Sequence, residues 1–224
     1  MNAKQIAGYR AAELVEAGMT VGLGTGSTAY FAIERIGQMV QQGLSIQAVA
    51  TSVASAEQAQ ALGIPLLDID QVRTIDLTID GVDEVDPNFH GIKGGGGALF
   101  REKIVASASR RNVWILDPSK LVSKLGAFRL PVEVLPFGYT HVEQQLRQDG
   151  FDPILRQKGG APFVTNNGNY ILDLQLNDSK SHEEMADYLI RTVGVLEHGL
   201  FLGTTDLLIV GRPEGAQIIE KPLK

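Results

Sequence analysis

The feature that most constrains the fold is a repeated alternation of short apolar segments with segments of helical periodicity. Thr20–Leu23 is a short apolar run that leads through a glycine-rich turn into Ala29–Val40, where apolar residues recur at helical spacing. The same succession continues, with further strands and helices expected at Ile46–Ala50, Ser52–Leu62, Pro65–Leu67, Thr74–Asp80, Ala98–Arg111 and Val113–Leu116. Strands that alternate with helices favour a parallel sheet covered by helices.

The pattern changes after Leu130. The order expected there is strand, helix, strand, strand, helix, strand, at Val132–Leu135, Thr140–Gln148, Ile154–Arg156, Tyr170–Gln175, Glu183–Arg191 and Leu196–Leu202. This β-α-β-β-α-β order is the ferredoxin-like arrangement. The last apolar segments, Asp206–Gly211 and Gly215–Glu220, can return to the first sheet. The sequence therefore predicts an α/β protein with a large parallel-sheet domain at 1–130 plus 206–224 and a smaller α+β domain inserted at 131–205.

Composition narrows the classes of function. The chain has 224 residues and a net charge of −6 at pH 7, the wrong sign for a protein that neutralises nucleic-acid phosphates. The absence of cysteine excludes disulfides and thiolate chemistry and fits a reducing, cytoplasmic location. The first twenty residues have the pattern of an amphipathic helix, and no run approaches the ~18 apolar residues of a membrane span. We therefore expect neither a nucleic-acid partner nor a membrane partner.

The loop from Gly22 to Thr28 has two interpretations. Its glycines resemble a dinucleotide fingerprint, but the third falls one place early, and the strand that ends near Thr51 offers no acid for a ribose hydroxyl. Small residues nevertheless let backbone N–H groups approach an anion, and Ser27 and Thr28 add hydroxyl donors before a helix. The loop is either a site for a small phosphate or a tight turn with a capping hydroxyl.

Two further segments place charged residues beside glycine. Asp80 and Asp83 follow an alternating strand at its carboxyl end, where open α/β sheets bind ligands; the alternative is an Asx turn with solvated acids. Lys93 precedes the four glycines Gly94–Gly97, directly before a helix. Because such a run is costly in chain entropy, it indicates that another group comes close to that backbone.

Glu102 is the candidate base. Its helical neighbours Leu99, Val105 and Ala106 are apolar, and a carboxylate removed from water has a raised pKa and is a good base; the alternative is a surface glutamate. Lys120 follows another strand and is a second candidate cation. We expect no metal site, because no ligand spacing links the four histidines, His90, His141, His182 and His198.

The sequence resembles the type A ribose-5-phosphate isomerases in the joint order and spacing of five segments: Gly24-Thr25-Gly26-Ser27-Thr28, Asp80-Gly81-Val82-Asp83-Glu84, Lys93-Gly94-Gly95-Gly96-Gly97-Ala98-Leu99, Arg101-Glu102-Lys103 and Leu130-Pro131-Val132-Glu133-Val134. The resemblance spans nearly the whole chain. It implies a Rossmann-like large domain, a smaller α+β domain, and interconversion of ribose 5-phosphate and ribulose 5-phosphate without metal or cofactor. It also implies a role in the pentose phosphate pathway, or the Calvin cycle in a photosynthetic host, and a homodimer or larger homo-oligomer.

The resemblance also implies the site residues. It makes Glu102 the proton acceptor, with Asp80, Asp83 and Lys93 also catalytic. Substrate contacts are expected at Thr25, Gly26, Ser27, Thr28, Asp80, Gly81, Val82, Asp83, Lys93, Gly94, Gly95, Gly96 and Lys120. Lys4 resembles a basic position near the phosphate. The expected mechanism passes through an enediolate, with Lys93 at the developing oxyanion and the two aspartates on the sugar hydroxyls.

Two rival functions stay open at this point. A sugar-phosphate deaminase or an acyl-CoA transferase can use a related fold, but both lack these motifs in this combination. A sugar-phosphate-sensing module of a transcription regulator needs a DNA-binding helix pair before the sheet, whereas here the sheet begins by about Thr20 and the chain is acidic.

Overall fold

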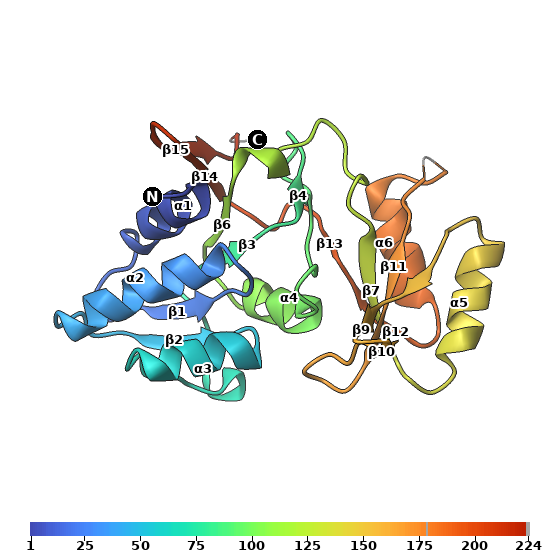
Figure 1. Cartoon of the computed structure of the whole chain (residues 1–224), viewed down its shortest axis with the longest axis horizontal. Coiled ribbons are helices and arrows are strands. Elements are labelled where there is room, and N and C mark those ends of the chain that lie inside the picture. The colour runs from blue at the N-terminus through green and yellow to red at the C-terminus, as the bar shows by residue number, and fades with distance from the viewer. Residues whose placement is uncertain (178, 223–224) are drawn as a thin grey trace. The chain divides into compact units, whose positions relative to one another are not determined.

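The computed structural model describes residues 1–177 and 179–222 and divides into two compact units (Figure 1). The first unit comprises Met1–Val82, Arg101–Leu121 and the chain from Gly203 onward, and the second comprises Asp83–Phe100 and Val122–Leu202. The expected small domain at 131–205 therefore overlaps a larger unit that also holds 83–100 and 122–130. The difference arises because two strands in 83–92 pair with residues 200–201.

The first unit is built on a six-stranded sheet in the order β15-β14-β6-β3-β1-β2. Its strands are β1 (Thr20–Leu23), β2 (Gln47–Ala50), β3 (Leu77–Gly81), β6 (Asn112–Leu116), β14 (Leu207–Arg212) and β15 (Gly215–Glu220). Every neighbouring pair is parallel except β14–β15. The predicted parallel sheet and the return of the last two strands to it are confirmed.

Helices cover both faces of this sheet. The helices are α1 (Ala3–Ala12), α2 (Ala29–Gln41), α3 (Val53–Ala61) and α4 (Leu99–Ser107), with a short 3₁₀ turn, η1 (Ile69–Gln71). Residues of α1, α2 and α3 form one apolar cluster with Leu23 and Ile79, whereas Val105 of α4 packs with Val49 and Ile75. Alternation along each strand therefore sends even and odd positions to different helical layers.

Several expected elements in this unit are shorter than the pattern suggested, among them the strand expected at Thr74–Asp80, which begins at Leu77 as β3. The apolar run Pro65–Leu67 makes only an isolated bridge from Leu66 to Ala48. The helix expected to reach Arg111 ends at Ser107, because the following backbone pairs instead with Ile75, which bridges Ser109 and accepts the N–H of Arg110 at 2.8 Å.

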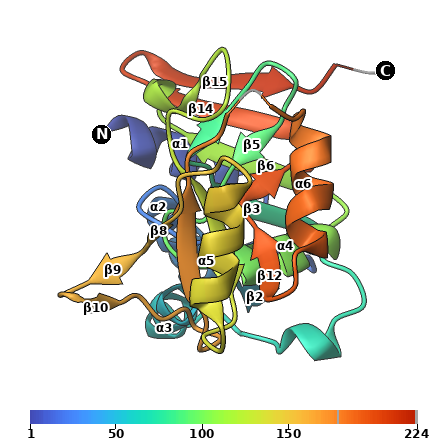
Figure 2. The same ribbon diagram turned by 90° about the vertical axis from the view of Figure 1, so that its right-hand side faces the viewer.

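The second unit contains a four-stranded antiparallel sheet in the order β12-β7-β11-β8. Its elements are β7 (Leu130–Val134), α5 (Tyr139–Gln148), β8 (Ile154–Leu155), β11 (Tyr170–Leu174), α6 (His182–Arg191) and β12 (Val195–His198). This succession confirms the predicted β-α-β-β-α-β order. Val132 and Leu172 on one face pack with Leu146 of α5 and Leu189 of α6, and Figure 2 shows the two helices beside these strands.

The strand expected at Leu196–Leu202 is interrupted. Gly199 separates β12 from β13 (Leu200–Phe201), which joins a second antiparallel sheet with β5 (Gly91–Ile92) and β4 (Glu84–Val85). A Cβ at Gly199 would lie 2.2 Å from the carbonyl oxygen of Lys93, so only glycine fits there. A short hairpin of β9 (Gln157–Lys158) and β10 (Ala161–Pro162) extends from the unit (Figure 2). Within the described part of the chain, no helix is long and apolar enough to span a membrane.

Candidate active site

The glycine-rich loop after β1 is held by a buried carboxylate from the next strand. Oδ1 of Asp80 accepts hydrogen bonds from the backbone N–H groups of Thr25 at 2.9 Å and Gly81 at 2.7 Å. A Cβ at Gly24 would lie 2.2 Å from the same oxygen, so the close approach of loop and carboxylate requires glycine. Asp80 is therefore an organiser of the loop, which the Asx-turn interpretation did not include.

A group of hydroxyls that the sequence analysis missed supports this loop. The hydroxyl of Thr25 lies 2.7 Å from that of Thr51, and the buried Ser55 hydroxyl donates to the carbonyl of Gly24 at 2.6 Å. Thr51 follows β2 and Ser55 lies in the first turn of α3. Small polar residues at the end of a strand are the only sequence signal, because the contact joins positions about 30 residues apart.

Glu102 is buried, with only 3% of its surface exposed. It lies one turn before Val105 on α4, and Val105 faces the sheet, because a Cβ at Gly22 would lie 2.8 Å from its Cγ1. Since α4 connects the parallel strands β3 and β6, its first turn lies at the carboxyl edge of the sheet, the edge that carries Asp80. The surface-glutamate alternative is therefore excluded.

Cationic side chains gather beside the first loop. Nζ of Lys4 donates to the hydroxyl of Ser27 at 2.8 Å. Burial alone would raise the pKa of Asp117, but hydrogen bonds from Ser119 and the charges of Lys120 and Lys4 outweigh it and hold that pKa below its usual value. Two lysines and an exposed hydroxyl thus share one small region of the first unit.

The first turn of α2 does not follow the capping interpretation. Thr28 is the N-cap residue, yet its side chain makes no capping hydrogen bond within residues 1–177 and 179–222. Ser27 bonds Lys4 instead. Among the described residues, the predicted capping hydroxyl is therefore not found at the start of α2.

In the second unit, the small three-stranded sheet brings Asp83 and Lys93 to the same end. Asp83 directly precedes β4 and Lys93 directly follows β5, and these strands pair antiparallel. The backbone N–H of Lys93 donates to the carbonyl of Gly199 at 2.9 Å. Its buried ammonium lies 5.4 Å from the ring centre of Phe201, a cation–π contact.

The glycine segment Gly94–Gly97, here called the glycine ribbon, adopts a backbone that other residues disfavour. Gly94 and Gly97 have φ angles of 106° and 77°. The N–H of Gly95 donates to Oδ2 of Asp83 at 2.7 Å. Gly95 and Gly96 are exposed, whereas the positions on either side are buried. The middle backbone of the ribbon is therefore accessible from solvent.

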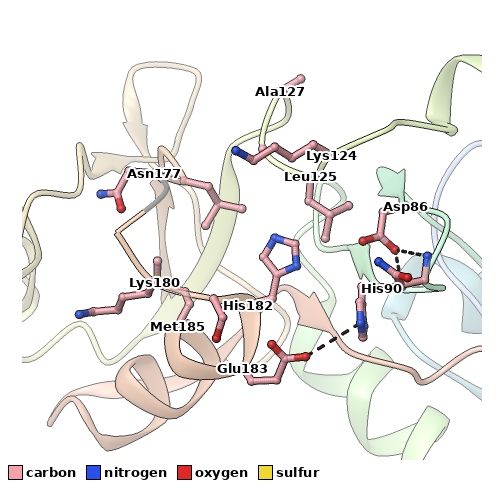
Figure 3. Close-up of a pocket in the computed structure, with 14 residues that line it drawn as sticks. Asp86, His90, Lys124, Leu125, Ala127, Asn177, Lys180, His182, Glu183 and Met185 are labelled. Atoms are coloured by element: carbon pink, nitrogen blue, oxygen red, sulfur yellow. Dashed lines mark hydrogen bonds and ion pairs between the residues drawn. The ribbon is translucent and has the colours of Figure 1, made fainter.

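A cavity of about 780 Å³ also lies in the second unit, and Figure 3 shows its lining. Lys124 and Lys180 line it together with Asp86 and Glu183, so both signs of charge are present. Nε2 of His90 lies 4.0 Å from Oε1 of Glu183. None of the predicted site residues lines this cavity, and its mixed charge selects no class of ligand.

The structure thus distributes the predicted residues over two sets. The first unit holds Lys4, Thr25, Gly26, Ser27, Thr28, Asp80, Gly81, Val82, Glu102 and Lys120. The second unit holds Asp83, Lys93, Gly94, Gly95 and Gly96. Among the described residues, no cluster of three or more histidine, cysteine, aspartate or glutamate side chains is arranged to bind a metal ion.

Comparison with known proteins gives one consistent family. The family model for ribose 5-phosphate isomerase A (phosphoriboisomerase A) matches residues 47–215. The ribose-5-phosphate isomerase A of Listeria innocua is 51% identical over 223 residues, which cover 99% of this chain and 100% of the relative.

Solved structures agree with the sequence comparison. Ribose 5-phosphate isomerase from Plasmodium falciparum superposes with a TM-score of 0.94 at 36% identity, covering 98% of both chains. A D-ribose-5-phosphate isomerase solved in complex with phospho-erythronic acid has a TM-score of 0.93 at 35% identity, covering 98% of this chain and all of the other. Both comparisons span the two compact units.

Proposed function

The chain belongs to the ribose 5-phosphate isomerase A family and interconverts ribose 5-phosphate and ribulose 5-phosphate, and we propose that Glu102 is the base of this reaction. The activity places the protein in the pentose phosphate pathway. The observation that carries the proposed role is the burial of Glu102 at the carboxyl edge that also holds Asp80.

The chemistry requires a base shielded from water. Moving a carbonyl between C2 and C1 removes a weakly acidic proton from carbon while charge builds on the neighbouring oxygen. Glu102 takes the proton from C2 of ribose 5-phosphate, leaving an enediolate with its charge on the C1 oxygen. The proton of the C2 hydroxyl then moves to the C1 oxygen while Glu102 returns its proton to C1, so that the carbonyl forms at C2; the reverse reaction uses the same residue. Burial limits exchange of that proton with solvent and strengthens the interactions of the carboxylate with the substrate.

Lys93 stabilises the enediolate in this proposal. A fixed ammonium in a water-poor site lowers the energy of a developing oxyanion far more than it would in bulk water. The burial of Lys93 and its fixed backbone support that role. Asp83 and Asp80 orient the sugar hydroxyls and assist ring opening, although Asp80 also has the structural task of holding the Thr25 backbone.

The phosphate group is assigned to the first unit. Lys4, Ser27 and Lys120 supply positive charge and a hydroxyl donor, and Gly26 and Thr28 supply backbone next to the start of α2. Lys93 and the ribbon contact the sugar itself in this proposal.

Replacement of Glu102 tests the proposed base. Glu102→Gln keeps the shape of the side chain and removes its basicity, so turnover of ribose 5-phosphate should fall by about 10³-fold or more while the sugar phosphate still binds. Glu57→Gln, an exposed glutamate on α3, is the matched control and should be unaffected. Near-normal turnover by Glu102→Gln would remove this residue from the role.

We also propose that the enzyme is cytoplasmic, forms a homo-oligomer and works without metal or cofactor. The cysteine-free sequence supports a cytoplasmic enzyme, which also serves the Calvin cycle where the host is photosynthetic. A homodimer or larger homo-oligomer is supported by Phe137 and Val193, exposed by 95% and 90%. Sedimentation tests the assembly. Full activity in excess chelator would support a reaction without metal, and loss of activity restored by a divalent cation would contradict it.

A further inference from the structure

Arg156 connects the glycine ribbon to the four-stranded sheet of the second unit. Its Nη1 donates to the carbonyl oxygens of Gly94 at 2.8 Å and Gly95 at 3.2 Å. Its Nε donates to Oδ2 of Asp173 at 2.9 Å, and Nη2 donates to the other oxygen of the same carboxylate. The two side chains are only 14% and 19% exposed. A largely buried bidentate ion pair therefore holds the guanidinium that binds the ribbon.

The geometry of this contact depends on a guanidinium. Its planar fork can bind a carboxylate with two N–H groups and still direct another N–H group elsewhere, which a lysine ammonium does with far less fixed geometry. The ring of Phe163 lies 5.9 Å from Cζ of Arg156 and also occupies the space beside Gly97, where a Cβ would come within 2.4 Å of the ring. Arg156 thus binds the first half of the ribbon, and Phe163 packs beside its last glycine.

The ribbon is held from two sides. Asp83 accepts the N–H of Gly95, and Arg156 donates to the carbonyls of Gly94 and Gly95. Consecutive glycines lose more conformational entropy on ordering than any other residues, so such a segment stays in one conformation only if specific contacts hold it. The position of the exposed middle of the ribbon therefore depends on these contacts.

We propose that Arg156, oriented by Asp173, is a positioning residue that fixes the backbone of Gly94–Gly95 for binding of the sugar. The inference rests on the proposed function, in which the ribbon contacts substrate. Lys93 is fixed separately, through the carbonyl of Gly199 and the ring of Phe201. Loss of the Arg156 contact therefore weakens sugar binding more than it weakens the chemical step.

Steady-state kinetics and hydrogen exchange together test the positioning role. Arg156→Gln should raise KM for ribose 5-phosphate by about tenfold or more and change kcat by less than about threefold. Amide exchange at 94–97 should become faster without substrate. For Arg156→Lys, both KM and the rate of amide exchange at 94–97 should lie between those of Arg156→Gln and the wild type. Asp173→Asn should shift KM in the same direction, and the double variant should be no worse than Arg156→Gln, because both residues act through one contact.

Arg147→Gln is the matched control. Arg147 lies in the same unit and also combines an ion pair, to Glu143 at 2.9 Å, with a bond to a backbone carbonyl, that of Pro153 at 3.1 Å. Its loss should leave KM and ribbon exchange unchanged.

The possible outcomes distinguish failure of the positioning role of Arg156 from failure of the proposed function. Unchanged amide exchange at 94–97 in Arg156→Gln overturns the claim that Arg156 holds the ribbon. Faster exchange with an unchanged KM overturns the positioning role and shows that the ribbon is not the sugar contact that the proposed function requires. A lower kcat with unchanged KM and a lower melting temperature overturns positioning in favour of a structural role. If Glu102→Gln retains turnover while Arg156→Gln raises KM, the base assignment fails and the positioning role stands.

Discussion

The two glycine-rich segments of this protein look alike in sequence and are constrained in different ways. In the first unit, Gly24 is required because the buried side chain of Asp80 occupies the space of a Cβ. In the second unit, Gly94 and Gly97 are required by left-handed backbone angles, and the ribbon between them is bound by Asp83 and Arg156.

Glycine content alone therefore does not define a ligand-binding loop. The first loop is fixed by a carboxylate from the adjacent strand, so its rigidity belongs to the parallel sheet. The second is fixed by Asp83, directly before β4, and by Arg156, which Asp173 of β11 holds, so its rigidity depends on the second unit being folded. Substitutions in the two segments should therefore fail for different reasons.

Gly24→Ala should have the largest effect. Its Cβ would lie 2.5 Å from the Cα of Asp80, so backbone must move, whereas the Cβ of Gly97→Ala meets the outer atoms of the Phe163 ring, which can shift. We expect Gly24→Ala to lower kcat/KM by about 100-fold or more and Gly97→Ala to lower it less. Gly18→Ala, in an open turn with φ of 86°, controls for backbone strain. A larger loss in Gly97→Ala would reverse the comparison.

Lys93→Ala should have the next largest effect. If Lys93 stabilises the developing oxyanion, its removal should reduce kcat/KM by up to about 100-fold, mostly through kcat. Lys180→Ala is the control, because Lys180 lies over the ring of Tyr188 and lines a cavity that none of the predicted site residues lines. An equal loss of kcat/KM for ribose 5-phosphate in the two variants would show that Lys93 does not stabilise the oxyanion.

Lys4→Ala tests whether the first loop binds the phosphate. Loss of its charge and of the bond to Ser27 should weaken inhibition by inorganic phosphate by about tenfold, with little change in kcat. Lys158→Ala, on the exposed hairpin of the second unit, should leave phosphate inhibition as it is. An unchanged inhibition constant for phosphate in Lys4→Ala would show that the phosphate does not bind beside Lys4 at this loop.

The smallest effect concerns stability at high pH and only the second unit. Burial and the hydrogen bond to Asp149 raise the pKa of Tyr188 to about 12. Because the folded pKa exceeds the ordinary value of 10.0, the neutral phenol stabilises the fold below about pH 10, and this stability is lost as pH rises toward about 12. In Tyr188→Phe, the free energy of unfolding measured in urea should fall less between about pH 10 and pH 12 than it does in the wild type. An identical pH profile in the variant would show that Tyr188 does not contribute.

Local pattern was sufficient for much of the fold. Strands β1 and β6 and helix α2 lie within a residue or so of their predicted limits, because buried apolar alternation and helical periodicity are encoded within each segment. The break at Gly199 was not predictable, since it depends on the carbonyl of Lys93, more than 100 residues earlier in the chain.

The site shows the same limit. The burial of Glu102 was one of the two interpretations that its local, apolar helical neighbours left open, and the structure decides for it. The roles of Arg156 and Asp173 did not follow from the sequence, because an arginine after a short strand and an aspartate in an alternating strand have the pattern of ordinary surface residues. Only the antiparallel pairing of β8 with β11 brings them together. Groups that hold a loop in place are thus harder to find from sequence than groups that act on substrate.

The most direct test of Glu102 as the single base is the transfer of a deuterium label from C2 to C1 of the sugar. Ribose 5-phosphate carrying deuterium at C2 should give ribulose 5-phosphate with part of the label at C1 and part lost to water, because one buried carboxylate carries it between the carbons. Glu102→Gln should abolish both transfer and washout. Transfer in Glu102→Gln at the wild-type rate, or complete washout of the label by the wild-type protein in a single turnover, would contradict a single shielded base at Glu102.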